Sequence, residues 1–192
     1  MTSSNFILLK EQFDKNINPD VISNIIQNDL IIREANPKAT GKGITIKNIF
    51  NALTLHLDEK NRKIYFIKGE TKINDATIFF IDNNKLQVLL IELKSNNVGT
   101  YKEQILYGKF YSDFIINVLV HKNTKINFDK IEYRGFVFTT GRIKENKRPT
   151  KRGIYFSSKE NGIYYKSMEN NKEYNFIELI APIDYPDEID KE

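Results

Sequence analysis

The chain of 192 residues has no cysteine and only two histidines. Without cysteine it can form no disulfide, no zinc ribbon and no thiol nucleophile, and this composition fits a reducing compartment. A serine-hydrolase triad finds no support either, because the sequence has no GxSxG motif and few histidines.

Long apolar runs are also missing. The run Phe6 to Leu9 is too short for a signal-peptide core, and it lacks a positively charged start. No window approaches the roughly 18 apolar residues that a membrane-spanning helix requires. The sequence therefore predicts a cytoplasmic protein that makes no contact with a membrane.

The composition is that of an ordinary globular domain. With 40% hydrophobic and 28% charged residues, the chain can bury a core without a disulfide or a structural metal. We expect a single domain over residues 1–192. The net charge of +4 favours nucleic acid as a partner, although only weakly.

Hydrophobic spacing predicts an α/β protein with a mixed central sheet flanked by helices. Asn18, Pro19 and Asp20 are typical of a helix start, so we expect an N-terminal helix over 18–36. The predicted core then follows as helix 45–57, strands 63–67, 75–81 and 86–94, helix 101–118 and strand 133–140. Short strands at 153–157, 162–167 and 174–180 would form a β-rich extension over 141–183, before an acidic tail at 184–192.

The most informative segment is the hairpin formed by strands 75–81 and 86–94. Glu92 and Lys94 are two residues apart in a strand, so their side chains should point to the same face. They end an apolar run where a buried charge needs a reason. Asp75 and Glu92 are equally distant from the turn at Asn83 and Asn84, which predicts that the two carboxylates lie side by side.

Two neighbouring carboxylates can share a divalent cation, and hard oxygen ligands favour Mg²⁺ or Mn²⁺. The metal ligands would be Asp75, Glu92 and the backbone carbonyl of Leu93. The cation would activate a water and neutralise charge on a phosphate. Lys94 would orient or deprotonate that water, or stabilise the pentavalent phosphate.

Asp75 followed by Glu92-Leu93-Lys94 at a strand end, with a helix and a strand behind it, resembles the PD-(D/E)XK nuclease superfamily. That resemblance covers about residues 45–140 and implies a restriction-endonuclease-like fold with a helix, three strands, a helix and a strand. It implies catalytic roles for Asp75, Glu92 and Lys94, and some members add a glutamine on the following helix, which is Gln104 here. Asn74 stands where members often have proline. Helix 45–57 also lacks the acidic residue that many members carry.

The resemblance implies a metal-dependent endonuclease, with DNA favoured as the substrate. A basic loop could follow the phosphates through Lys144, Lys147, Arg148, Lys151 and Arg152. Such nucleases often act as homodimers that cut both strands, so a homodimer is one arrangement that the resemblance allows.

Three other interpretations stay open. An RNA endonuclease of the same fold would be favoured if His56 faced Asp75 and Glu92. A non-catalytic nucleic-acid-binding module would explain the missing acidic residue on helix 45–57. An interaction protein in which Glu92 and Lys94 only form a salt bridge would need no nucleic acid at all.

Overall fold

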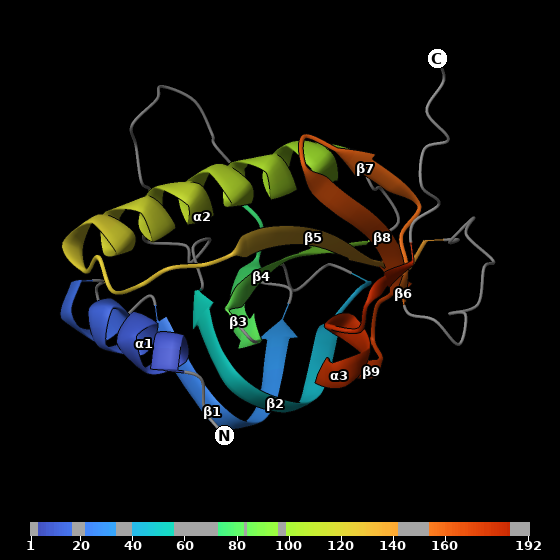
Figure 1. The fold of residues 1–192 in the computed structure, drawn as a ribbon. Helices are drawn as coiled ribbons and strands as arrows, with labels where there is room; N and C mark the ends of the chain where they lie inside the picture. The colour runs from blue at the N-terminus through green and yellow to red at the C-terminus, as the bar shows by residue number, and fades with distance from the viewer. Residues whose placement is uncertain are drawn as a thin grey trace, which may run out of the picture.

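The computed structural model describes residues 4–16, 22–33, 40–55, 73–82, 84–95, 99–141 and 154–184. These residues form a mixed α/β fold around one open sheet (Figure 1). The helices are α1 (Ser4–Asn16), α2 (Tyr101–Lys122) and α3 (Phe176–Leu179). The larger strands are β1 (Ile22–Arg33), β2 (Gly43–Leu55), β3 (Ala76–Asp82), β4 (Lys85–Lys94), β5 (Lys130–Thr139) and β8 (Ile163–Glu169).

The sheet has eight strands in the order β1-β2-β3-β4-β5-β8-β7, and β9 pairs with β2 outside this path. Strands β1 to β4 form an antiparallel meander, whereas β5 runs parallel to β4 and β8 runs parallel to β5. The parallel step from β4 to β5 requires a crossover, which α2 provides. Strand β4 is therefore central, and its pattern of burial on both faces agrees with that position.

The two long helices cover the same face of the sheet (Figure 1). Phe6, Leu9 and Phe13 of α1 join Ile105 and Leu119 of α2 in one core cluster with that face. Apolar residues of the β3–β4 hairpin complete the cluster, among them Phe79, Ile81, Val88 and Leu90. The side chains of β4 at Glu92 and Lys94 point to this helix-covered face, because they continue the alternation of Val88 and Leu90.

The opposite face is covered by the chain's own strands and by its last elements. Strand β2 bends over this face, and Figure 1 shows its strong curvature. Its second half pairs with β3, but Thr45 to Lys47 pair instead with β9 (Glu173–Asn175). Ile46 and Ile49 thereby pack with Phe176 and Leu179 in a second core cluster.

Two predicted helices are wrong. The segment predicted as helix 18–36 contains β1, and the segment predicted as helix 45–57 contains β2. In β2, Asn48 and Asn51 have left-handed φ values of 58° and 47°, and the pairing with β1 shifts next to Asn48. Across each irregularity the spacing of the buried residues changes from two to three, so Ile46, Ile49 and Ala52 imitate a helical stripe.

The N-terminal helix that does form is α1, which the sequence analysis did not predict. Strand 63–67 lies outside the described residues. The hairpin strands, α2 and β5 are found where they were predicted, with ends that differ by a few residues.

The C-terminal segment is rich in short strands, as predicted, but it is joined to the central sheet. The predicted strand 174–180 is wrong, because most of it forms helix α3 (Phe176–Leu179) after the short strand β9. Strand β8 pairs along β5, and β7 (Ser158–Glu160) forms a hairpin with β8. The remaining strands β6 (Ile154–Tyr155) and β10 (Ile183–Asp184) form a separate pair. The acidic tail beyond residue 184 lies outside the described residues. Within the described part of the chain, no helix combines the length and apolarity needed to cross a bilayer.

Candidate active site

The β3–β4 hairpin has the register that the sequence predicted. Its paired residues run from Asp82 opposite Lys85 to Ala76 opposite Ile91. Asp75 precedes Ala76, so one further step of the same register places it opposite Glu92. Directly opposed residues in an antiparallel pair point to the same face, and both carboxylates therefore belong to the end of the hairpin beside α2.

Asp75 is fixed to the neighbouring strand by its side chain. Its Oδ2 atom accepts a hydrogen bond of 2.6 Å from the backbone N–H of Leu93. A backbone N–H bound to a carboxylate is a charge-assisted hydrogen bond, which is stronger than the same bond to a neutral acceptor. The carboxylate of Asp75 is thus held against the backbone between Glu92 and Lys94.

Glu92 and Lys94 form an ion pair at the end of β4. The Nζ atom of Lys94 lies 2.6 Å from Oε1 of Glu92, and the exposed fractions of the two side chains are 19% and 2%. A carboxylate this deeply buried needs a close counter-charge, because desolvation penalises the ionised form. The predicted arrangement of both side chains on one face is therefore observed, with the lysine nearer to solvent.

Gln104 completes this cluster from the first turns of α2. Its side chain is buried, and its Oε1 atom accepts a hydrogen bond from Nζ of Lys94. Tyr107 does not share this position: its hydroxyl donates to Glu103 on the exposed side of α2, and that hydrogen bond raises the pKa of Tyr107. Lys94 is consequently held from two sides, by Glu92 and by Gln104.

Asn74 is a contributor that the sequence analysis noted only as a departure from the family pattern. It is fully buried, and its Nδ2 atom donates to the carbonyl of Ala76 at 2.6 Å and to Oγ1 of Thr77 at 3.1 Å. These bonds define the backbone path into β3 directly beside Asp75. Gly108 of α2 allows the approach, since a Cβ there would lie 1.8 Å from Oδ1 of Asn74.

Thr139 is a residue of this region that the sequence analysis missed. It pairs in register with Lys94 across the parallel β4–β5 ladder, and it is buried. Its hydroxyl donates to the carbonyl of Ser95 at 2.8 Å, which ties the end of β5 to the residue after Lys94. The parallel order of β4 and β5 is the signal that would have placed it.

The donor set suits a magnesium ion that retains much of its own water. Within the described residues, no group of three or more histidine, cysteine, aspartate and glutamate side chains is placed to hold a metal. The protein ligands would be the carboxylates of Asp75 and Glu92, with the carbonyl of Leu93 still a prediction. Mg²⁺ is often held by one or two carboxylates, with waters and substrate phosphates completing its shell, so these residues fit such an ion.

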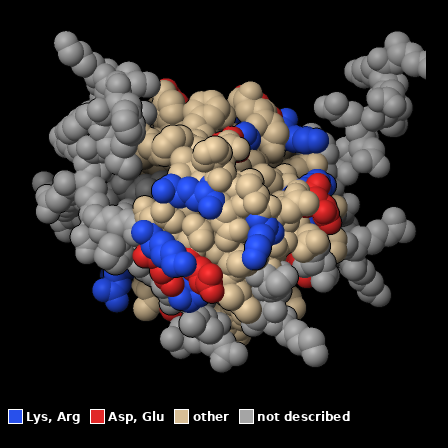
Figure 2. All heavy atoms as spheres, turned by 60° about the vertical axis from the view of Figure 1, so that its left-hand side comes forward, with Lys and Arg blue, Asp and Glu red and all other residues tan. Residues whose placement is uncertain are grey.

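The predicted nucleic-acid contacts are not part of this geometry. His56 and the basic loop lie outside the described residues, the loop residues being Lys144, Lys147, Arg148, Lys151 and Arg152. Figure 2 shows the side of the molecule that lies on the left in Figure 1. The lysine and arginine side chains visible there stand among uncharged residues, and acidic side chains accompany some of them. The phosphate contacts of the loop stay a prediction.

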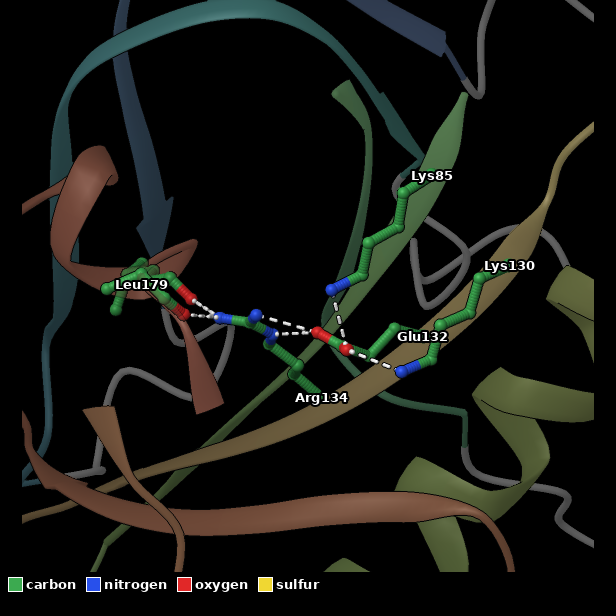
Figure 3. A network of polar contacts seen from close by, with 6 residues as sticks. Lys85, Lys130, Glu132, Arg134 and Leu179 are labelled. Atoms are coloured by element: carbon green, nitrogen blue, oxygen red, sulfur yellow. Dashed lines mark hydrogen bonds and ion pairs between the residues drawn. The ribbon is translucent and has the colours of Figure 1, made fainter. Parts of the chain in front are cut away.

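A second polar cluster lies on the opposite face of the sheet (Figure 3). Arg134 is fully buried and donates to Oε1 of Glu132 and to the carbonyls of Leu179 and Ala181. Lys85 forms a 2.7 Å ion pair with the other oxygen of Glu132. Leu179 is the last residue of α3, and Ala181 follows the helix. Because Arg134 donates to these two carbonyls, the cluster attaches the C-terminal segment to β5 and has a structural role.

Comparison of the chain with protein-family models, with curated proteins and with solved structures finds no match. A functional assignment must therefore be argued from the cluster itself. That cluster consists of Asp75, Glu92, Lys94 and Gln104, brought together by β3, β4 and α2.

Proposed function

We propose that this protein is a metal-dependent endonuclease that hydrolyses phosphodiester bonds, with DNA favoured over RNA. The observation that carries the proposal is the position of Lys94, whose ammonium contacts both Glu92 and Gln104. The carboxylate of Asp75 is bound to the backbone beside it. Two carboxylates can hold a divalent cation for phosphodiester hydrolysis, and a lysine beside them can stabilise negative charge at the phosphate.

The order of elements supports the more specific fold, that of the PD-(D/E)XK or restriction-endonuclease-like nucleases. Helix α1 is followed, after β1, by β2, β3 and β4, then by α2 and by β5. This order is helix, four strands, helix and strand, so it has one strand, β1, more than the expected helix, three strands, helix and strand. The first helix and first strand come from other segments than the sequence predicted, whereas the hairpin that carries the cluster is the predicted one.

Asp75 and Glu92 would hold the cation, and Mg²⁺ or Mn²⁺ would supply positive charge and an activated water at the phosphate. The acidic residue often found on the first helix has no counterpart facing the sheet. Glu11 and Asp14 of α1 are both exposed, and Asp14 pairs with Lys10. We therefore propose one protein-bound cation with a largely aqueous shell.

Lys94 would act on the phosphate. An ammonium group has three N–H donors, and Glu92 and Gln104 engage it from two sides. A further N–H would donate to a non-bridging oxygen and stabilise the negative charge of the pentavalent transition state. Gln104 is a positioning residue in this scheme, because it touches Lys94 and not the substrate.

The test is cleavage of plasmid DNA and of a labelled single-stranded RNA, in the presence of Mg²⁺, Mn²⁺ or EDTA. Wild type should cut with metal and not with EDTA, and Lys94→Ala should lose at least about a hundredfold in rate. Lys85→Ala is the matched control, since Lys85 begins the strand that Lys94 ends and forms an ion pair with Glu132. Cutting by this control should be unchanged.

The substrate that is cut decides between the DNA and the RNA endonuclease. If neither wild type nor the Lys94→Ala variant cuts, but both bind nucleic acid, the chain is a non-catalytic binding module. Two observations support that alternative. Within the described residues, no group of three or more possible metal-binding side chains is placed to hold a metal, and Lys94 already contacts Glu92 and Gln104. If the protein neither cuts nor binds, Glu92 and Lys94 form only a structural ion pair.

A further inference from the structure

A groove of about 360 Å³ lies beside the first residues of β2. Its walls come from the end of β1, the start of β2 and the turn that leads into β9, and Figure 1 shows β9 alongside the first part of β2. Three of its lining residues are cations and one is a carboxylate, so positive charge is in excess. We refer to this site as the Arg33 groove, and its lining includes Arg33, Lys42, Gly43, Lys172 and Glu173.

Two of the three cations in the Arg33 groove are placed to receive an anion. Within the part of the chain that the structure describes, no carboxylate pairs with Arg33 or Lys42, and both residues are exposed. The third cation, Lys172, is paired with Glu169. A guanidinium presents a planar fork of N–H donors and an ammonium a compact charge, and both groups bind phosphate. A phosphate in this groove would therefore meet two cations that need not leave another partner.

The backbone beneath these cations is fixed and carries no side chain at its centre. Gly43 lies opposite Arg33 in the β1–β2 register, and it has a φ of 135°. A Cβ there would lie 2.2 Å from a backbone carbonyl of β1, so the position requires glycine. The N–H groups of Lys42 and Gly43 donate to the side chains of Asn171 and Asn170 at 2.7 and 3.2 Å. A site on a fixed backbone loses less conformational freedom when it binds a ligand.

The Arg33 groove lies next to the strand end that carries Lys94. The segment before β2 packs on the end of β4, because a Cβ at Gly41 would lie 3.4 Å from the carbonyl oxygen of Lys94. The same segment contacts the residue after β5, since the hydroxyls of Thr40 and Thr140 lie 3.1 Å apart. The groove and the candidate active site are therefore at the same end of the sheet, where one extended polyanion can reach both.

We propose that the Arg33 groove binds the phosphate backbone of a nucleic acid, on the stretch of strand that adjoins the phosphate at Lys94. The identity of this polyanion rests on the proposed nuclease function. Arg33 and Lys42 contact the phosphate oxygens, and the site is separate from the predicted basic loop. The described residues that line the groove include no aromatic side chain, so it offers no stacking platform for bases. The groove therefore contributes affinity and position without sequence preference.

Binding of the full chain to a short fluorescent DNA duplex in EDTA separates this site from catalysis. The double variant Arg33→Gln, Lys42→Gln should bind about tenfold more weakly or worse, and the slope of log K against log salt should fall by about one to two. The matched control is Lys122→Gln, Lys125→Gln, which also removes two positive charges. Helix α2 starts beside Lys94 and has 22 residues, so these two lysines lie about 33 Å away. This control should bind as wild type does, and equal weakening by both pairs overturns the proposal.

Glu173 provides a variant with the opposite effect. Its carboxylate lines the groove and lies 3.4 Å from Nζ of Lys47. Glu173→Gln removes a charge that repels phosphate and also releases Lys47 from one of its partners, so it should tighten DNA binding by about threefold. Glu11→Gln removes an exposed carboxylate of α1 and should change binding little. Weaker binding by Glu173→Gln contradicts a phosphate in this groove.

Cleavage assays on the same variants distinguish the groove from the nuclease. With Mg²⁺, the double variant Arg33→Gln, Lys42→Gln should show its loss in KM, as expected for contacts made equally before and during the reaction. Cleavage with the wild-type KM and salt dependence overturns the groove and leaves the nuclease function intact. Binding that depends on Arg33 and Lys42 without any cleavage retains the groove and overturns the nuclease function. Wild type that binds no DNA and no RNA overturns both.

Discussion

Gly108 of α2 lies directly against Asn74, and a Cβ at position 108 would come within 1.8 Å of Oδ1 of Asn74. Asn74 is fully buried, and it bonds to the first residues of β3. Helix α2 and the segment that leads to Asp75 therefore pack closely at position 108, where the glycine leaves room for Asn74. Any side chain at position 108 must displace the chain next to the candidate active site.

Gly108→Ala should destabilise the protein by about 2 kcal/mol, the cost of overpacking a filled core. This sign is opposite to the usual effect in a helix interior, where alanine is about 1 kcal/mol better than glycine. Urea unfolding measures the change. Asn74→Ala removes the atom that the new Cβ would meet, so adding it to Gly108→Ala should recover part of the loss. A stabilised single variant would show that the contact is not tight.

The buried ion pair at the end of β4 should behave as a coupled unit. Lys94→Met leaves the carboxylate of Glu92, which is 2% exposed, without its counter-charge, and should lower the free energy of unfolding by about 3 kcal/mol. The double variant Glu92→Gln, Lys94→Met should recover most of this loss. Lys109→Met is the control, since Lys109 is equally buried but its partner Asp113 is 35% exposed, and its loss should stay below about 1 kcal/mol. Equal losses in the single and double variants would contradict the coupling.

The cluster on the other face predicts a dependence on pH. Burial acts to raise the pKa of Glu132, but the hydrogen bond from Lys85 and the charge of Arg134 outweigh it, so this pKa lies below its ordinary value. A lowered carboxyl pKa adds stability above the unfolded pKa of about 4.5, and this stability is lost as pH falls through the folded value.

The stability advantage of wild type over Glu132→Gln should therefore shrink between about pH 5 and about pH 3. Chemical denaturation of both proteins across that range measures it. Glu11→Gln, which changes an exposed carboxyl of α1, controls for the general loss of a negative charge. An advantage that stays constant as pH falls would argue against the ion pair as its source.

The bend of β2 should depend on residues that accept left-handed backbone angles. Asn51 has a φ of 47°, which asparagine and glycine adopt readily and β-branched residues do not. Asn51→Val should therefore destabilise the fold by about 1–2 kcal/mol, whereas Asn51→Gly should be nearly neutral. Thermal unfolding of the two variants compares them at one position. Similar losses for valine and glycine would indicate that the asparagine side chain matters more than the backbone angle.

The sequence predicted what local pattern determines. The β3–β4 hairpin has an apolar run with an asparagine turn, and these two signals were sufficient to place Asp75 opposite Glu92. The spacing did not predict which side of α2 faces the sheet. Phe110 and Phe114 extend the apolar stripe of the helix, but both are exposed in the structure. Spacing identifies an apolar side of a helix, but it does not tell which partner covers it.

Other features depend on contacts between distant segments, and no local pattern encodes them. The burial of Arg134 is satisfied by the carbonyls of Leu179 and Ala181, which lie more than forty residues further along the chain. Isoleucine-rich β1 was assigned to a helix because its spacing fits one, although β-branched residues favour strands. The pairing of β1 with β2 makes this segment a strand and not a helix.

The pairing of β2 with β9 has a consequence for synthesis of the protein. Backbone N–H of Lys42, just before β2, bonds to Asn171, a residue 129 positions later in the chain. Strand β2 leaves the ribosome well before β9 and α3 have been synthesised. Until then, Ile46 cannot pack in the core cluster that it shares with Phe176 in the folded protein. Contacts of such long sequence separation slow folding, and they expose an incomplete sheet to aggregation. The nascent chain is thus expected to complete its fold late and to benefit from a chaperone until then.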